Sequence, residues 1–241
     1  MAAIGAVLLS LVLFGCATGG VEKVEQLKPG TKIIPLSLMG DKLAIRHIGT
    51  TVLQNESRDL DTPSWGIDKY VEATAARAIL QGARFSAIVA DSAQARKSVG
   101  KLGQDFWTSA AVVEGGQESV VSLAKDAGAD YVLVLGPSQI GDPFFGTNQR
   151  FSGYGIAQRS FMGMKRGINF LTMRLVLLDG RDGREVARTQ SYLGSPRARS
   201  DWIEGENLPL SESNATTTKV SIESLVDRML GKGLADLKLI Q

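Results

Sequence analysis

The chain has 241 residues, 44% hydrophobic and 22% charged, a composition typical of a globular protein with a sizeable core in one domain or at most two. Its 27 Lys and Arg residues face 25 Asp and Glu residues, and a net charge of +2 is too small to indicate nucleic-acid binding. A single histidine and a single cysteine exclude a multi-histidine metal site and an internal disulfide. We therefore expect no metal and no cofactor.

An uncharged apolar run occupies residues 4 to 14. It is about half as long as the roughly 20 residues that a membrane-spanning helix needs. Its length fits the roughly 7 to 15 apolar residues of a secretory signal, although no Lys or Arg precedes it. We predict a signal peptide over residues 1–15.

The run ends in Leu13-Phe14-Gly15-Cys16, which resembles the lipobox of bacterial lipoproteins. The resemblance implies that the Cys16 thiol takes diacylglyceryl, that the chain is cut before it, and that the new amino terminus is acylated. Two or three acyl chains hold a protein stably on a membrane. Ala17 in place of Asp implies an outer-membrane anchor, facing the periplasm. The alternatives are a signal peptide with an incidental cysteine, or a buried amino-terminal helix.

Residues 16–30 combine Gly, Pro and charges with little periodicity, which predicts a flexible tether before a periplasmic domain over 31–241. The domain is expected to begin with a hairpin of two strands, 32–38 and 42–53, because the Gly-Asp pair between them is turn chemistry. Pro35 marks the first strand as an edge strand.

The middle of the chain alternates helices and strands. Thr62 and Pro63 are expected to begin a helix that runs to about Leu80 and stops at Gly82. A short strand (84–91) and a short helix (93–102) follow. Residues 117–127 carry a helical apolar stripe, and the uninterrupted apolar run after it predicts a strand buried on both faces.

The last third is expected to contain a second hairpin and a final helix. Strands over 168–178 and 185–192 are joined by Asp179-Gly-Arg-Asp-Gly, and apolar residues from Ile222 to Leu237 form an amphipathic stripe. The order of elements predicts an α/β fold. It is a single sandwich with a mixed sheet, helices packed on it and a carboxy-terminal amphipathic helix.

At "LAKDAGADYVLVLG" and "LVLLDGRDGREVART" the chain resembles the small α/β domains of the curli-export lipoprotein family and of the Tol-system propeller protein's amino-terminal part. The resemblance covers residues 42 to 240 as an order of elements. It implies an envelope assembly or scaffold protein without enzymatic activity. The curli-export family inserts membrane-spanning strands in this domain, but Gly153, Gly155 and Gly163 interrupt the alternation that such strands require.

Short motifs that could indicate catalysis have a structural explanation. Ser122 and Lys125 match the S-x-x-K pattern, but both lie inside a predicted helix and the companion motifs are missing from the sequence. The Asp179 and Asp182 carboxylates fit a tight turn, and His47 fits a structural role in a strand.

Residues 143 to 167 form the most unusual stretch, because aromatic and basic residues alternate there and no acid occurs from Pro143 to Leu178. Aromatic residues and arginine are enriched at binding hot spots. One interpretation is a Gly-rich strand pair with arginines facing water, and the other is a recognition surface for an anionic partner. The candidate partner-binding residues are Phe145, Arg150, Tyr154, Arg159, Lys165 and Arg166.

Two functional hypotheses follow. The first is a non-enzymatic envelope lipoprotein that is anchored to the membrane and binds or scaffolds an envelope protein or an anionic envelope component. The second is a periplasmic hydrolase whose site lies after the apolar strand, at Gly136-Pro137-Ser138-Gln139, because ligands of α/β sheets bind at the carboxyl ends of strands. Convergence of polar residues in one pocket there would favour the hydrolase.

Overall fold

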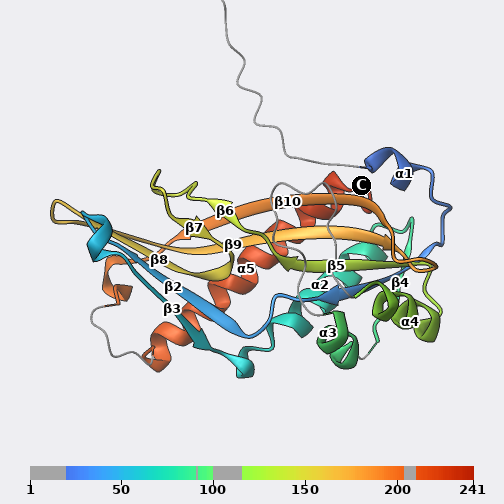
Figure 1. Ribbon diagram of the computed structural model, residues 1–241, viewed down its shortest axis with the longest axis horizontal. Helices are drawn as coiled ribbons and strands as arrows, with labels where there is room; N and C mark the ends of the chain where they lie inside the picture. The colour runs from blue at the N-terminus through green and yellow to red at the C-terminus, as the bar shows by residue number, and fades with distance from the viewer. Residues whose placement is uncertain (1–19, 91, 100–115, 204–209) are drawn as a thin grey trace, which may run out of the picture.

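The computed structural model describes residues 20–90, 92–99, 116–203 and 210–241. The predicted signal peptide and Cys16 lie outside these residues. The predicted α/β class is confirmed, with one large mixed sheet, helices packed on it and a long carboxy-terminal helix (Figure 1).

Strand β9 (Met164–Asp179) is the central strand of the sheet. One of its edges pairs with β10 (Glu185–Pro196), and the other pairs first with β8 (Gly153–Phe161) and then with β5 (Tyr131–Pro137). The sheet therefore divides into two wings that share β9 and β10. The β8 wing continues with β2 (Lys42–Ile48) and β3 (Glu56–Asp61), and the β5 wing with β1 (Lys32–Ser37) and β4 (Ser86–Ala87).

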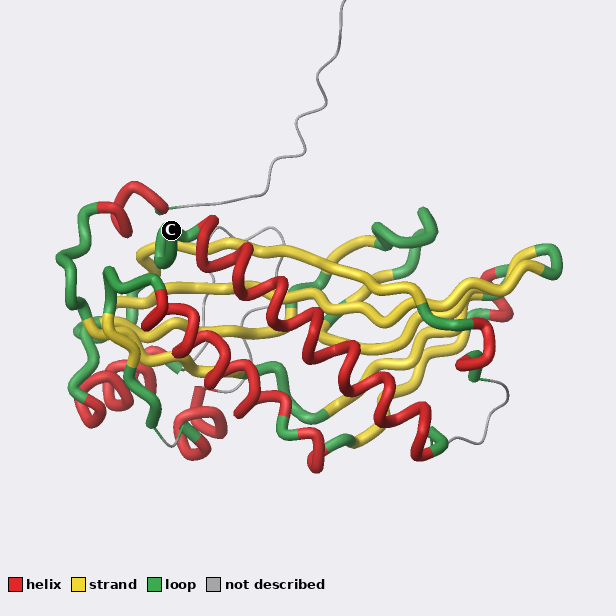
Figure 2. The backbone as a smooth tube through the Cα atoms, turned by 180° about the vertical axis from the view of Figure 1, so that it is seen from behind, coloured by secondary structure: helices red, strands yellow, loops and turns green. Residues whose placement is uncertain are grey.

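Helices α2 (Ile67–Gln81) and α5 (Glu212–Asp236) cover one face of the sheet along its whole length (Figure 2). On the other face, α3 (Ala93–Val99) and α4 (Gln117–Ala127) cover the β5 wing. The segment that carries the short strands β6 (Ile140–Gly141) and β7 (Arg150–Phe151) covers the β8 wing.

The burial of β5 on both faces is confirmed. Leu133 and Leu135 point into the principal core with α2 and α5, whereas Val132 and Val134 point into a second cluster with α3 and α4. A strand covered on both faces has no water-facing side, which explains its uninterrupted apolar sequence.

The predicted hairpin over 32–38 and 42–53 is wrong. β1 pairs in parallel with β5 and β4, and β2 pairs with β3 and β8, so the Met39-Gly40-Asp41 turn carries the chain from one wing to the other. β1 is not the outermost strand, yet β4 pairs only with its first two residues. β4 has therefore ended before Pro35, so β1 has no strand on that edge at the position of Pro35. Pro35 lacks an N–H to donate to such a neighbour.

Three boundaries also differ from the prediction. Pro63–Trp65 form a separate 3-10 turn (η2), and α2 begins only after Gly66, whose φ is 61°. The strand expected over 84–91 is confined to β4. The described part of the predicted tether is packed, because Val24 of helix α1 (Val21–Glu25) is buried in the core and Arg84 donates to the Glu25 carbonyl at 2.6 Å.

Two glycines give a matched test of the sheet. A Cβ on Gly155 of β8 would lie 2.0 Å from the Ala44 carbonyl oxygen of β2, whereas a Cβ on Gly231 of α5 meets nothing within 4 Å. We expect Gly155→Ala to lower the free energy of unfolding by about 1–3 kcal/mol, and Gly231→Ala to raise it by about 0.5–1 kcal/mol. Chemical denaturation of both variants measures this, and equal effects would contradict the pairing.

Candidate functional site

Two turns lie side by side at the end of the β8 wing. Met162 and Gly163, with φ of 48° and 77°, form the two-residue turn of the β8–β9 hairpin. The 3-10 helix η1 (Val52–Gln54) follows β2. The Thr50 hydroxyl donates to the Ser160 carbonyl at 3.4 Å, which joins the two turns. Figure 1 shows both at the extreme end of the molecule.

Large apolar side chains on both turns face water. The exposed fractions are 69% for Val52, 97% for Leu53, 79% for Met162 and 61% for Met164. They make up half of the exposed large hydrophobic side chains in the described ranges. We call these four residues the distal tip. An exposed apolar patch of this kind marks an interaction site.

The η1 turn is held by its own side chains. The Gln54 amide oxygen accepts hydrogen bonds from the backbone N–H groups of Thr50 and Thr51, at 3.0 and 3.2 Å. Gly49 N–H donates to the Asn55 side chain at 3.0 Å. A turn fixed at this many points presents Val52 and Leu53 in a defined geometry.

Phe145 and Tyr154 do not lie on the surface, so the structure does not place them where the sequence predicted a partner contact. Tyr154 is buried in the principal core, where its hydroxyl donates to the Gly40 carbonyl at 3.2 Å and burial raises its pKa to about 12. Phe145 packs beneath the β6–β7 segment with Phe151 and Phe170. These aromatic residues fill a core. The sequence could not show whether they are buried or exposed, because most of this segment is irregular and has no periodicity that marks a buried face.

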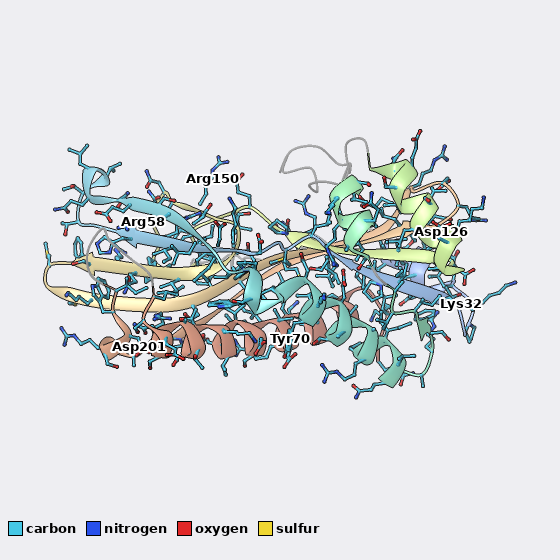
Figure 3. All side chains as sticks on the ribbon, turned by 90° about the horizontal axis from the view of Figure 1, so that it is seen from below. Lys32, Arg58, Tyr70, Asp126, Arg150 and Asp201 are labelled. Carbon is cyan, nitrogen blue, oxygen red and sulfur yellow. The ribbon has the colours of Figure 1, made fainter. Side chains whose placement is uncertain are left out.

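Three of the four basic candidates gather behind the distal tip. Arg159 and Arg166 are direct cross-strand partners on β8 and β9. Arg159 donates to the Phe145 carbonyl at 2.6 Å, and the Lys165 ammonium lies 5.1 Å from the Trp202 ring centre. Arg150 lies apart, on β7, and Figure 3 shows it nearer the middle of the molecule than Arg58. Like charges directly opposite each other destabilise a strand pair, and the contact with Phe145 gives a structural role to Arg159 but not to Arg166.

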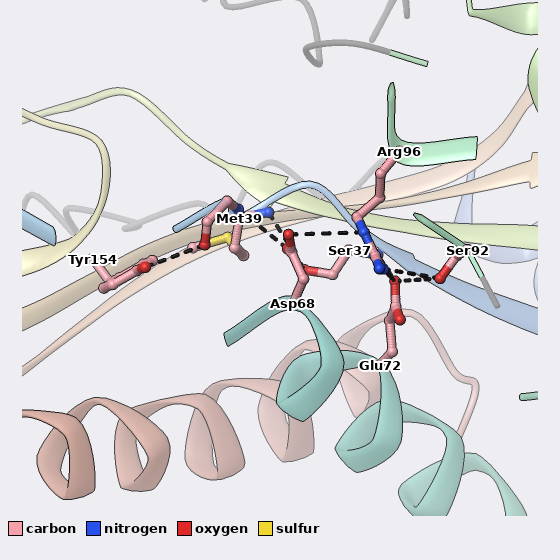
Figure 4. A network of polar contacts seen from close by, with 8 residues as sticks. Ser37, Met39, Asp68, Glu72, Ser92, Arg96 and Tyr154 are labelled. Atoms are coloured by element: carbon pink, nitrogen blue, oxygen red, sulfur yellow. Dashed lines mark hydrogen bonds and ion pairs between the residues drawn. The ribbon is translucent and has the colours of Figure 1, made fainter. Parts of the chain in front are cut away.

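The sequence did not predict a buried polar network at the carboxyl end of β1 (Figure 4). One Glu72 carboxylate oxygen accepts from Ser37 N–H at 2.9 Å, from the Ser92 hydroxyl at 2.8 Å and from the Arg96 guanidinium. Asp68, one helical turn earlier, accepts from the Ser37 hydroxyl at 2.6 Å and from Gly40 N–H at 3.1 Å. The residues come from β1, α2 and α3, from the loop between β1 and β2, and from Ser92 just before α3.

This network has the composition of an acid–base site but the contacts of a structural clamp. Glu72 and Ser37 are buried, and both carboxylates are committed to donors that tie the end of β1 to two helices. A general base needs an oxygen directed at a substrate. We therefore assign the network to holding the chain where it leaves one wing for the other.

The other catalytic candidates have structural partners. The buried Ser138 hydroxyl donates to the Gln190 amide oxygen at 3.2 Å, and the Thr172 hydroxyl donates to the Ser138 carbonyl at 2.6 Å. Asp179 accepts from the guanidinium of Arg181, which holds the pKa of this carboxyl below its usual range, within the predicted β9–β10 turn.

Neither a metal cluster nor a membrane-crossing helix is found in the described ranges. There, no three His, Cys, Asp or Glu side chains are arranged to hold a metal ion. Over the same residues, no helix combines the length and apolarity needed to cross a membrane.

No family model matches the chain, and no curated protein matches it. Among solved structures, PelC of Paraburkholderia phytofirmans, a dodecamer, is 12% identical with a TM-score of 0.39, covering 88% of this chain and 91% of PelC. The LpoB carboxy-terminal domain of Salmonella enterica is 13% identical with a TM-score of 0.31, covering 72% and 92%. Lipoprotein GNA1162 of Neisseria meningitidis is 12% identical with a TM-score of 0.33, covering 83% and 97%.

At these identities and TM-scores, the likeness to these three structures does not establish a function for this chain. The resemblance of the sequence to the curli-export family and to the Tol-system propeller protein stays a prediction.

The clamp gives a direct test of its structural role. Glu72→Ala removes the shared acceptor of the Ser37 N–H, the Ser92 hydroxyl and the Arg96 guanidinium, which keeps only the Asp68 carboxylate at 4.0 Å. We expect it to lower the free energy of unfolding by about 3–5 kcal/mol. The matched control is Asp236→Ala, which removes an ion pair to Lys232 near the end of α5 and should change that energy by less than about 1 kcal/mol. If the two variants unfold at the same denaturant concentration, the clamp assignment is wrong.

Proposed function

We propose that the protein is a non-enzymatic lipoprotein of the cell envelope, anchored at one end and binding an envelope component at the other. The observation that carries the proposal is the separation of the two ends along β9. Gly20, the first described residue, packs against Val186 of β10, beside the Ala187–Leu177 pair. From Leu177 to Met164 the strand runs about 40 Å, at roughly 3.3 Å per residue.

Cys16 supplies the anchor in this proposal. The chain from Cys16 to Gly20 can reach about 14 Å at most, so the lipid holds the α1 end close to the membrane. The distal tip then projects away from that membrane. Ala17 after the cysteine favours the outer membrane, facing the periplasm, by resemblance to lipoproteins.

The lack of enzymatic activity is supported by the contacts of the hydrolase candidates. The hydroxyl of Ser138 is directed at an amide oxygen, and Glu72 and Asp68 are committed to the clamp. A nucleophile needs a base within hydrogen-bond reach, and in the described residues Ser138 has Gln190 in that place.

The anchor is tested by Cys16→Ser in cells fed labelled palmitate. We expect the wild type to carry label and to fractionate with the outer membrane, and the variant to lose both properties because serine has no thiol to alkylate. Ala17→Ser is the control, since it keeps the cysteine and should keep the label. A wild type without label and a Cys16→Ser variant that still sediments with membranes would overturn the anchor.

A further inference from the structure

We propose that the distal tip inserts into the surface of an anionic phospholipid bilayer that faces the one holding the anchor. The identification of this bilayer as a second one rests on the proposed anchor at Cys16. The evidence for contact between the tip and lipid is the exposed apolar side chains of the tip and the basic residues behind them, and it does not depend on that anchor.

The apolar residues of the tip fit a bilayer better than a protein groove. Val52, Leu53, Met162 and Met164 are flexible or aliphatic side chains at the ends of two short turns. A stable protein interface buries about 800 Å² on each partner, over roughly 20 residues, and a pair of turns offers much less. Insertion between lipid headgroups needs apolar area but no complementary shape.

The charges behind the tip select anionic lipid. Arg159 and Arg166 face each other across the hairpin, and Lys165 follows Met164. No acid occurs in the sequence from Pro143 to Leu178. On the neighbouring β3, the Glu56 carboxylate is 3.3 Å from the Arg58 guanidinium. A negative surface attracts each basic residue near it.

The direction of the hairpin places the contact on an opposed membrane. Met162 lies in the turn before β9 and Met164 begins that strand, and the hairpin that carries them extends along the long axis of the sheet, away from α1 (Figure 1). If the molecule lay flat on the anchoring membrane, the tip would point parallel to that surface. An upright molecule directs the distal tip, with its four exposed apolar residues, toward a facing bilayer.

Vesicle capture tests the proposal with the full chain. Donor vesicles of phosphatidylcholine carry the protein, and labelled acceptor vesicles contain either phosphatidylcholine alone or phosphatidylcholine with phosphatidylglycerol. We expect capture of the phosphatidylglycerol vesicles, weakening at high salt, and little capture of the neutral ones. Leu53→Ser with Met162→Ser should reduce capture at least about tenfold, because it removes two large apolar side chains.

Matched controls separate the tip from general surface effects. Leu80→Ser with Val89→Ser changes two exposed apolar residues elsewhere, 53% and 72% exposed, and should leave capture unchanged. Arg166→Gln should weaken capture, whereas Arg150→Gln, a basic residue away from the tip, should not. Circular dichroism confirms that each variant keeps the fold.

Two results would overturn the proposal. One is equal capture by the tip variant and its control, and the other is capture only when the acceptor vesicles contain protein, which would indicate a protein partner. If the donor vesicles do not hold the chain, the anchor proposal fails instead. In that case the same variants are compared for direct binding to phosphatidylglycerol vesicles. The tip proposal still requires the double variant Leu53→Ser with Met162→Ser to bind less than the wild type.

Discussion

The length of β9 is the constraint on which the other elements depend. A 16-residue strand exposes backbone donors and acceptors along two edges and side chains on two faces, and all of them need partners. β10 supplies one edge, and β5 and β8 share the other end to end. The two wings, the helices on one face and the two separate covers on the other follow from this division. The result is an elongated domain with its first residues and its exposed turns at opposite ends.

Two buried polar clusters fix the chain where it changes direction. At one of them, Asp68 and Glu72 hold the crossing between the wings. At the other, the partly buried Arg197 guanidinium donates to the side chains of Asn169 and Thr218 at 2.6 and 2.7 Å, which ties β9 to the first turns of α5. Burial lowers the pKa of Arg197. The two clusters fix how the wings and α5 are placed relative to β9, the strand that separates α1 from the distal tip.

Local sequence signals predicted the elements that a short stretch of sequence defines by its own periodicity or turn residues. The bounds of α4, the doubly buried β5, the β9–β10 hairpin and the stripe of α5 all follow from periodicity and turn chemistry. The separation of β1 from β2 did not, because a Gly-Asp turn serves a crossing as well as a hairpin. Val52 and Leu53 were assigned to a strand for their apolarity, although Thr51 and Gln54 carry the spacing of a helix cap. The clamp could not be predicted, since its residues meet only after the sheet has formed.

Lipid contact at the tip can be measured by fluorescence quenching. A bimane label at Leu53→Cys or Met162→Cys reports on the tip, and a label at Leu80→Cys serves as reference. The protein sits in unlabelled phosphatidylcholine vesicles, and facing vesicles of phosphatidylglycerol carry a spin-labelled lipid. Our account predicts quenching at positions 53 and 162 and not at 80. Quenching at none of the three positions, or equally at all of them, would contradict it.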